Sequence, residues 1–179
     1  MIALPNYHPC RSLLPLVRTL FDITLLRKGP DSIPASGVLL LLVIGLWLFA
    51  SLTILSLIEQ YDENDFIIGL YTALAGVVAY TAILVVAGHA SRAMQTMTAI
   101  LGCGALISLA FVAEFVLFTP FLGSTITGIV AQLILLWSVP VEGHIIARAL
   151  GRHWYIGIVI AIGVFVLQYV IYSAMSPAG

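Results

Sequence analysis

Residues 38–58 read VLLLLVIGLWLFASLTILSLI, a segment without one charged side chain. A bilayer core of about 30 Å needs roughly 20 apolar residues in a helix to cross it. Four further runs of this kind follow, at residues 66–87, 97–118, 126–147 and 155–175. The sequence therefore predicts an all-α, polytopic membrane protein whose five transmembrane helices form one bundle over residues 38–175.

The composition agrees with that prediction. Hydrophobic residues make up 61% of the 179 residues and charged residues only 8%, whereas charged residues are roughly 25% of a soluble domain. The connections between the runs are short, which leaves no room for a separate soluble domain. The seven basic residues are too few to suggest a nucleic-acid partner, and we expect them to lie at the membrane surface among lipid headgroups.

The basic residues all fall on one side of the five-run pattern. They precede the first run or lie between the second and third or the fourth and fifth: Arg11, Arg18, Arg27, Lys28, Arg92, Arg148 and Arg152. Short loops rich in Lys and Arg stay in the cytoplasm. We therefore expect residues 1–37 to form a cytoplasmic N-terminal segment and residues 176–179 a short tail outside.

The segment before the first run has helical periodicity. At 100° per residue, residues 11–26 divide into two faces. The polar face holds Arg11, Arg18 and Asp22, and the apolar face holds Leu13, Leu16, Val17, Leu20 and Ile23. This pattern predicts an amphipathic helix lying in the membrane interface, which would either anchor the bundle or dock a cytosolic partner.

Two acids lie inside the predicted spans, Glu114 and Glu142. An acid at such a depth is a functional candidate because it is costly to keep there. At 1.5 Å per residue the two carboxyl groups lie about 16 Å apart in depth, so they cannot share a proton or a metal. For Glu114 we expect a hydrogen-bonded or neutral side chain near the outer interface, with a relay or ion path as the alternative.

Glu142 belongs to a denser group of unusual residues, since Pro140, Gly143 and His144 lie within two positions of it. Proline removes a hydrogen bond within the helix and leaves a carbonyl free near the acid. Three interpretations stay open: a structural kink with a satisfied acid, a partner-binding or gating element, and a proton-coupling site.

His144, Arg148 and Arg152 recur at a spacing of four residues, which predicts one basic face at the inner end of the fourth span. That face suits lipid headgroups. His89 and His153 should lie at the same depth, but their spacing matches no HxxxH or HExxH pattern, so we predict no metal site. GxSxG, GxxxxGK[ST] and GxGxxG are absent, and we predict no catalytic residue, no cofactor and no enzyme.

The chain resembles the Yip-domain family, the Rab/Ypt-interacting type of five-span membrane protein, and in particular its small bacterial members. The resemblance rests on residues 21–30, 33–36 and 137–150. It implies a cytoplasmic N-terminus and, for the bacterial members, a location in the inner membrane. Because eukaryotic members are associated with vesicle traffic and GTPases, it also implies a non-enzymatic membrane adaptor.

The leading hypothesis is therefore a non-catalytic bundle that binds a protein partner or organises membrane lipids at its cytoplasmic face, with homo-oligomers as a further possibility. The main alternative is a small transporter or channel that uses Glu142 with Gln132 and Gln168. Against transport stands the lack of an internal repeat. A membrane enzyme with acids and histidines near one face is the third alternative.

Overall fold

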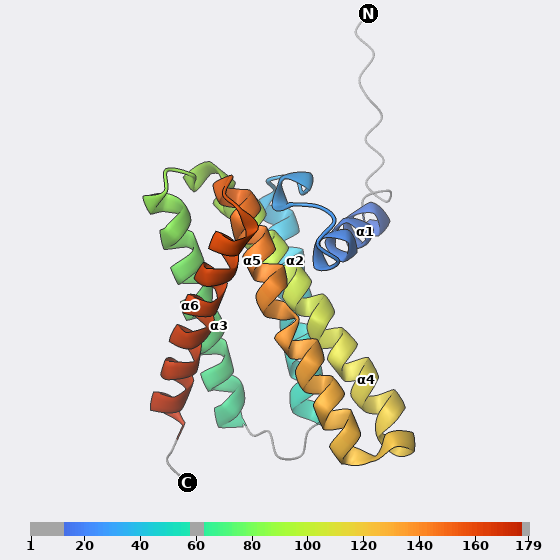
Figure 1. The fold of residues 1–179 in the computed structure, drawn as a ribbon. Coiled ribbons are helices and arrows are strands. Elements are labelled where there is room, and N and C mark those ends of the chain that lie inside the picture. The colour runs from blue at the N-terminus through green and yellow to red at the C-terminus, as the bar shows by residue number, and fades with distance from the viewer. Residues whose placement is uncertain (1–12, 58–62, 177–179) are drawn as a thin grey trace, which may run out of the picture.

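The computed structural model describes residues 13–57 and 63–176, and all regular structure within them is helical (Figure 1). The α-helices are α1 (Leu13–Thr24), α2 (Gly37–Leu57), α3 (Glu63–Val86), α4 (Ala93–Leu136), α5 (Ser138–Leu150) and α6 (Trp154–Met175). Two short 3-10 helices, η2 (Pro30–Ser32) and η3 (Ala90–Arg92), lie in the connections. The predicted all-α polytopic class is confirmed.

Five segments within the described residues are long and apolar enough to cross a membrane, but their division differs from the helix labels. They are Gly37–Leu57, Asn64–Val86, Ala90–Gly123, Thr125–Leu150 and Trp154–Met175. Helix α4 turns back on itself at Gly123, where φ is 74° and ψ 160°, a conformation that glycine alone adopts readily. The third span is thus the first arm of α4, and the fourth span is its second arm followed by α5 (Figure 1).

Helix α1 lies across one end of the bundle, as expected of an interfacial helix (Figure 1). Leu20 and Ile23 of its apolar face are packed inward, at 2% and 0% exposed, whereas Val17 of the same predicted face is 51% exposed. Leu20 fits against Gly102 of α4, where an added Cβ would come within 2.7 Å of the leucine side chain. The helix ends at Thr24, two residues before the predicted end, and Arg11 of the predicted polar face lies outside the described residues.

The spans do not pack in chain order. Helix α2 packs mainly against α4, and α6 packs against both α5 and α3, whereas the consecutive helices α2 and α3 barely touch. The closest crossing is that of α5 with α6, because a Cβ at Gly157 would collide with the carbonyl oxygen of Gly143. Small residues at such a crossing let two helix backbones approach closely inside a membrane.

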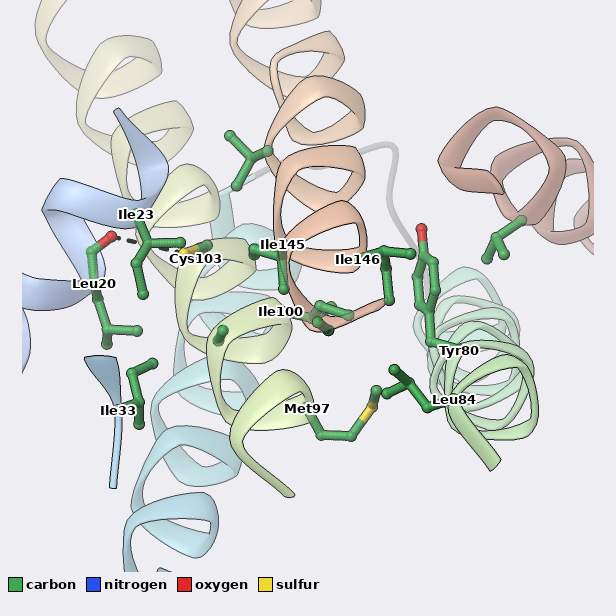
Figure 2. Packing of buried hydrophobic residues seen from close by; sticks show 14 of the residues in the cluster. Leu20, Ile23, Ile33, Tyr80, Leu84, Met97, Ile100, Cys103, Ile145 and Ile146 are labelled. Carbon is green, nitrogen blue, oxygen red and sulfur yellow. Dashed lines mark hydrogen bonds between the residues drawn. The ribbon is translucent and has the colours of Figure 1, made fainter. Parts of the chain in front are cut away.

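The hydrophobic core gathers toward the end that carries α1. Figure 2 shows Leu20 and Ile23 of α1 beside Cys103 of α4, and Tyr80 of α3 beside Ile146 of α5. We call this the basic end. It comprises α1, the linker of residues 25–36, η3, and the turn of residues 151–153 between α5 and α6. The turn at Gly123 marks the opposite end (Figure 1).

Candidate functional site

Six basic residues of the described chain converge on the basic end and all are exposed: Arg18, Arg27, Lys28, Arg92, Arg148 and Arg152. The connecting segments and α1 contribute only two described acids there, Asp22 and Asp31. Lys28 Nζ lies 2.8 Å from Asp22 Oδ2. The hydrogen bond from Lys28 is the main reason that the pKa of Asp22 lies below its ordinary value of 3.8, with the charges of Lys28, Arg18 and Arg27 acting in the same direction. The end therefore carries a net positive charge.

The predicted basic face on α5 is divided between two roles. His144 Nε2 lies 3.0 Å from the carbonyl oxygen of Lys28, so Nε2 carries the proton in this bond and the imidazole is used within the fold. Arg148 presses its stem against Gly29, where an added Cβ would come within 3.3 Å of the arginine Cβ. Gly151, at φ 62°, ends α5 and leaves Arg152 exposed. Arg148 and Arg152 are therefore the two exposed members of the predicted face, and His144 is half-buried beside the linker.

Helix α1 and its linker are fastened to the spans by hydrogen bonds from side chains to main-chain carbonyls. Trp137 Nε1 donates to the oxygen of Thr24 over 3.0 Å, and Gln95 Nε2 donates to that of Ile33 over 2.8 Å. Cys103 Sγ lies 3.6 Å from the oxygen of Leu20, the contact dashed in Figure 2. Together with His144, these groups hold the segment of residues 20–33 at four points along its length. The basic end is therefore a defined surface rather than a loose tail.

Arginine 92 closes the same end from the other side. Its guanidinium donates to the carbonyl oxygen of Ala149 over 2.9 Å. That carbonyl lies in the last turn of α5, where carbonyl groups have no partner within the helix. Arg92 therefore caps α5 and ties the connection between α3 and α4 to it, so this base is structural as well as exposed.

Glu142 has a partner that the sequence did not reveal. Tyr80 of α3 is 2% exposed, and its hydroxyl donates to Glu142 Oε2 over 2.6 Å. A buried tyrosine hydroxyl needs a hydrogen-bond partner, and this was the only signal in the sequence that could have pointed to Tyr80. Of the three interpretations of Glu142, the geometry agrees with a structural kink that carries a satisfied acid.

Glu114 lies in the half of the bundle opposite the basic end, and its carboxyl group has a different environment from that of Glu142. It is 6% exposed, and within the described residues neither carboxylate oxygen has a hydrogen-bond partner. Of the two expected forms, the described residues supply no hydrogen bond to this carboxyl group, and the neutral side chain stays a prediction. A buried acid without partners destabilises the fold.

The two glutamines expected to accompany Glu142 lie elsewhere. Gln132 is exposed on the second arm of α4. Gln168 donates through Nε2 to the carbonyl oxygen of Thr72 over 3.0 Å, in the space left by Gly76. The change of helix at Trp137 interrupts the register between Gln132 and Glu142, so helical spacing does not keep the two side chains on one face. The structure does not bring together the three side chains of the predicted transport site.

The histidines at the basic end are likewise separate. His89 Nδ1 lies 2.8 Å from the carbonyl oxygen of Ala87, and the ring of His153 stacks on that of Tyr155. Among the residues that the structure describes, no three His, Cys, Asp or Glu side chains are grouped as a metal ion would require.

Comparison with protein-family models, with curated proteins and with solved structures finds no match for the chain.

Proposed function

We propose that the protein is a non-catalytic membrane bundle of the Yip-domain type, whose basic end binds an acidic protein partner at the membrane surface. The observation that carries the proposal is the exposure of Arg148 and Arg152 on a surface that is otherwise fastened to the bundle. Complementary charge across an interface orients the approaching partner and disfavours partners of the wrong charge. Because the surface is already ordered, binding does not have to order it.

The proposal includes a topology. The basic end faces the cytoplasm of a bacterial inner membrane and the Gly123 turn faces outward, since Lys and Arg in short loops are retained inside. Ser91 and Thr125 are exposed near the basic end and the opposite end, respectively. In a Cys10→Ser background, a membrane-impermeant maleimide should label Ser91→Cys in inside-out vesicles and Thr125→Cys in intact cells. The reverse pattern would refute this topology.

The binding proposal is tested by copurification in mild detergent, with proteins identified by mass spectrometry. We expect a stoichiometric partner with the wild type and its loss from the Arg148→Gln/Arg152→Gln variant. Asp31→Asn is the matched control, because Asp31 is exposed at the same end and its loss makes that end more positive. The control should retain the partner. A partner held equally by all three proteins would contradict the proposed surface.

Transport through Glu142 is the second candidate, and the buried Tyr80–Glu142 pair inside the bundle is the observation in its favour. A proton-coupled path would need Glu142 to exchange its partner during the cycle. Flux into proteoliposomes should then fall in Glu142→Gln. Equal flux for wild type and variant would remove this candidate and leave the binding function standing.

A further inference from the structure

An apolar groove runs from the basic end toward the middle of the bundle, between the end of α1 and the two arms of α4. Its volume is about 400 Å³, within the roughly 300–1,000 Å³ typical of ligand sites. The groove is lined by Phe21, Thr24, Leu106, Ile107, Ala110, Val130, Leu133, Ile134 and Trp137. Phe21, Leu133 and Trp137 are 57%, 62% and 45% exposed, so the groove opens to the surroundings of the bundle.

The lining offers no free polar group to a ligand. Thr24 Oγ1 donates to the carbonyl oxygen of Leu20 over 3.0 Å, and Trp137 Nε1 donates to that of Thr24. None of the lining side chains is charged. The part of the groove between Val130 and Trp137 is about 10 Å long at 1.5 Å per helical residue. An apolar channel of this length that opens within a bilayer suits a hydrocarbon chain.

The α1 end of the groove is positively charged. Asp22 follows Phe21 of the groove wall, and the positive charges of Lys28, Arg18 and Arg27 all act on its carboxylate. Lys28 forms an ion pair with Asp22, whereas Arg18 and Arg27 have no carboxylate partner among the described residues. Two exposed arginines therefore flank Phe21 and Thr24 of the groove in the chain, on an end of the bundle that suits anionic lipid headgroups.

We propose that this groove binds one anionic phospholipid, with an acyl chain between the arms of α4 and the phosphate held by Arg18 and Arg27. The inference goes beyond the proposed function, because it assigns a lipid to the basic end in addition to the protein partner. A bound chain also fills the gap beneath α1 and links the position of that helix to the lipid composition of the membrane.

The test uses the full chain in nanodiscs containing phosphatidylglycerol or phosphatidylcholine with identical acyl chains, each bearing a photoactivatable diazirine. The adducts are mapped by mass spectrometry. We expect adducts concentrated in residues 106–110 and 130–137. Phosphatidylglycerol should exceed phosphatidylcholine there by about tenfold, since each of two bases near the surface favours an anionic lipid.

Two variants separate the chain site from the headgroup site. Ala110→Trp fills the groove and should abolish both adducts, whereas Ala82→Trp, at an exposed alanine of α3, should leave them unchanged. Arg18→Gln/Arg27→Gln leaves every lining side chain intact, so it tests the site even if Ala110→Trp does not fold. This variant should keep the adducts and lose the preference for phosphatidylglycerol.

Adducts spread evenly over the lipid-facing helices, or equal labelling by the two lipids in the wild type, would overturn the inference. Partner capture is measured in the same preparations. If the groove result fails while Arg148→Gln/Arg152→Gln still loses its protein partner, only the lipid inference is wrong. If neither set of arginines matters, the proposed function fails with it.

Discussion

The basic half and the opposite half of the bundle are crossed by the same membrane spans but are held together differently. In the basic half, the side chains of Trp137, His144, Arg92 and Gln95 reach main-chain carbonyls far away in the sequence, and Tyr80 reaches Glu142. In the opposite half Gln168 donates to the carbonyl oxygen of Thr72, and Glu114 is buried without a hydrogen-bond partner among the described residues.

This difference shows which part of such a bundle determines how its helices pair. Lipid tails are as apolar as leucine, so burial of apolar faces alone does not fix which helices pair inside a membrane. Close packing of small residues and satisfied polar groups fix it instead. Both kinds of contact are concentrated near the basic end, which is also where the exposed arginines lie. A binding surface on the basic half keeps its shape because these contacts hold the helices beneath it in place.

The largest effect is expected at the α5–α6 crossing. Gly157→Ala would force its Cβ into the carbonyl oxygen of Gly143, and into Ala147, whose Cβ lies 2.7 Å from the added atom. We expect a loss of about 3 kcal/mol in the free energy of unfolding, because overpacked backbone contacts cannot relax without moving the helices apart. Thermal unfolding in detergent measures this loss.

Gly163→Ala is the matched control on the same helix, since an added Cβ there has no neighbour within 4 Å. It should stabilise the protein by roughly 0.5–1 kcal/mol through helix propensity. Equal effects at the two glycines would show that the crossing is looser than described.

Breaking the buried polar pair should be the next largest effect. Tyr80→Phe removes the hydroxyl and leaves Glu142 buried without this donor, which should lower stability by about 1–3 kcal/mol. The double variant Tyr80→Phe/Glu142→Leu should recover part of this loss, because both polar groups are then absent. Additive losses in the double-mutant cycle would mean that the two side chains are not coupled.

In the opposite half, removing a buried polar group should raise the stability of the protein instead of lowering it. Glu114→Leu replaces a buried carboxyl group that has no described partner, so it should stabilise the protein by about 1 kcal/mol or more. Glu114→Gln keeps a polar group in place and should gain less. If Glu114→Leu is destabilising in a urea or thermal unfolding series, the carboxyl has a partner that stabilises it.

The smallest effect concerns the surface ion pair of α1. The pKa of Asp22 is lowered in the folded protein, chiefly by the Lys28 hydrogen bond. The pair therefore stabilises the fold at pH values above the ordinary pKa of 3.8, and this contribution is lost as the pH falls through the lower folded value. Carbon-13 NMR of labelled aspartates should show a midpoint below 3.8 that rises in Lys28→Gln. An unchanged midpoint would show that Lys28 does not hold the carboxylate.

The number of spans and the interfacial helix could be predicted because each depends on residues near one another in the sequence. A run of roughly 20 apolar residues is a property of one segment, and the apolar face of Leu20 and Ile23 follows from a 100° repeat. Both features depend on the local sequence and not on how the helices pack. The structure confirms the fold class for this reason.

The partners of the site residues could not be predicted, because they depend on which helices pair. The transport alternative joined Gln132 with Glu142 in one site, but the helix changes at Trp137, whose own φ of −62° and ψ of −18° remain locally helical. By its spacing His144 belongs to the basic face with Arg148 and Arg152, but in the structure its Nε2 lies 3.0 Å from the carbonyl oxygen of Lys28. Tyr80 is 62 residues from Glu142, and no feature of either segment predicts their contact.

Photo-crosslinking from the two ends of the bundle in native membranes tests whether the basic end is a protein-binding surface. A photoreactive amino acid is placed either at Ser91, beside the basic end, or at Thr125, beside the Gly123 turn; both positions are exposed. We predict a discrete crosslinked protein partner from position 91, its loss when Arg148→Gln/Arg152→Gln is added, and none from position 125. A partner captured from position 125, or one captured from position 91 regardless of the two arginines, would contradict a binding surface at the basic end.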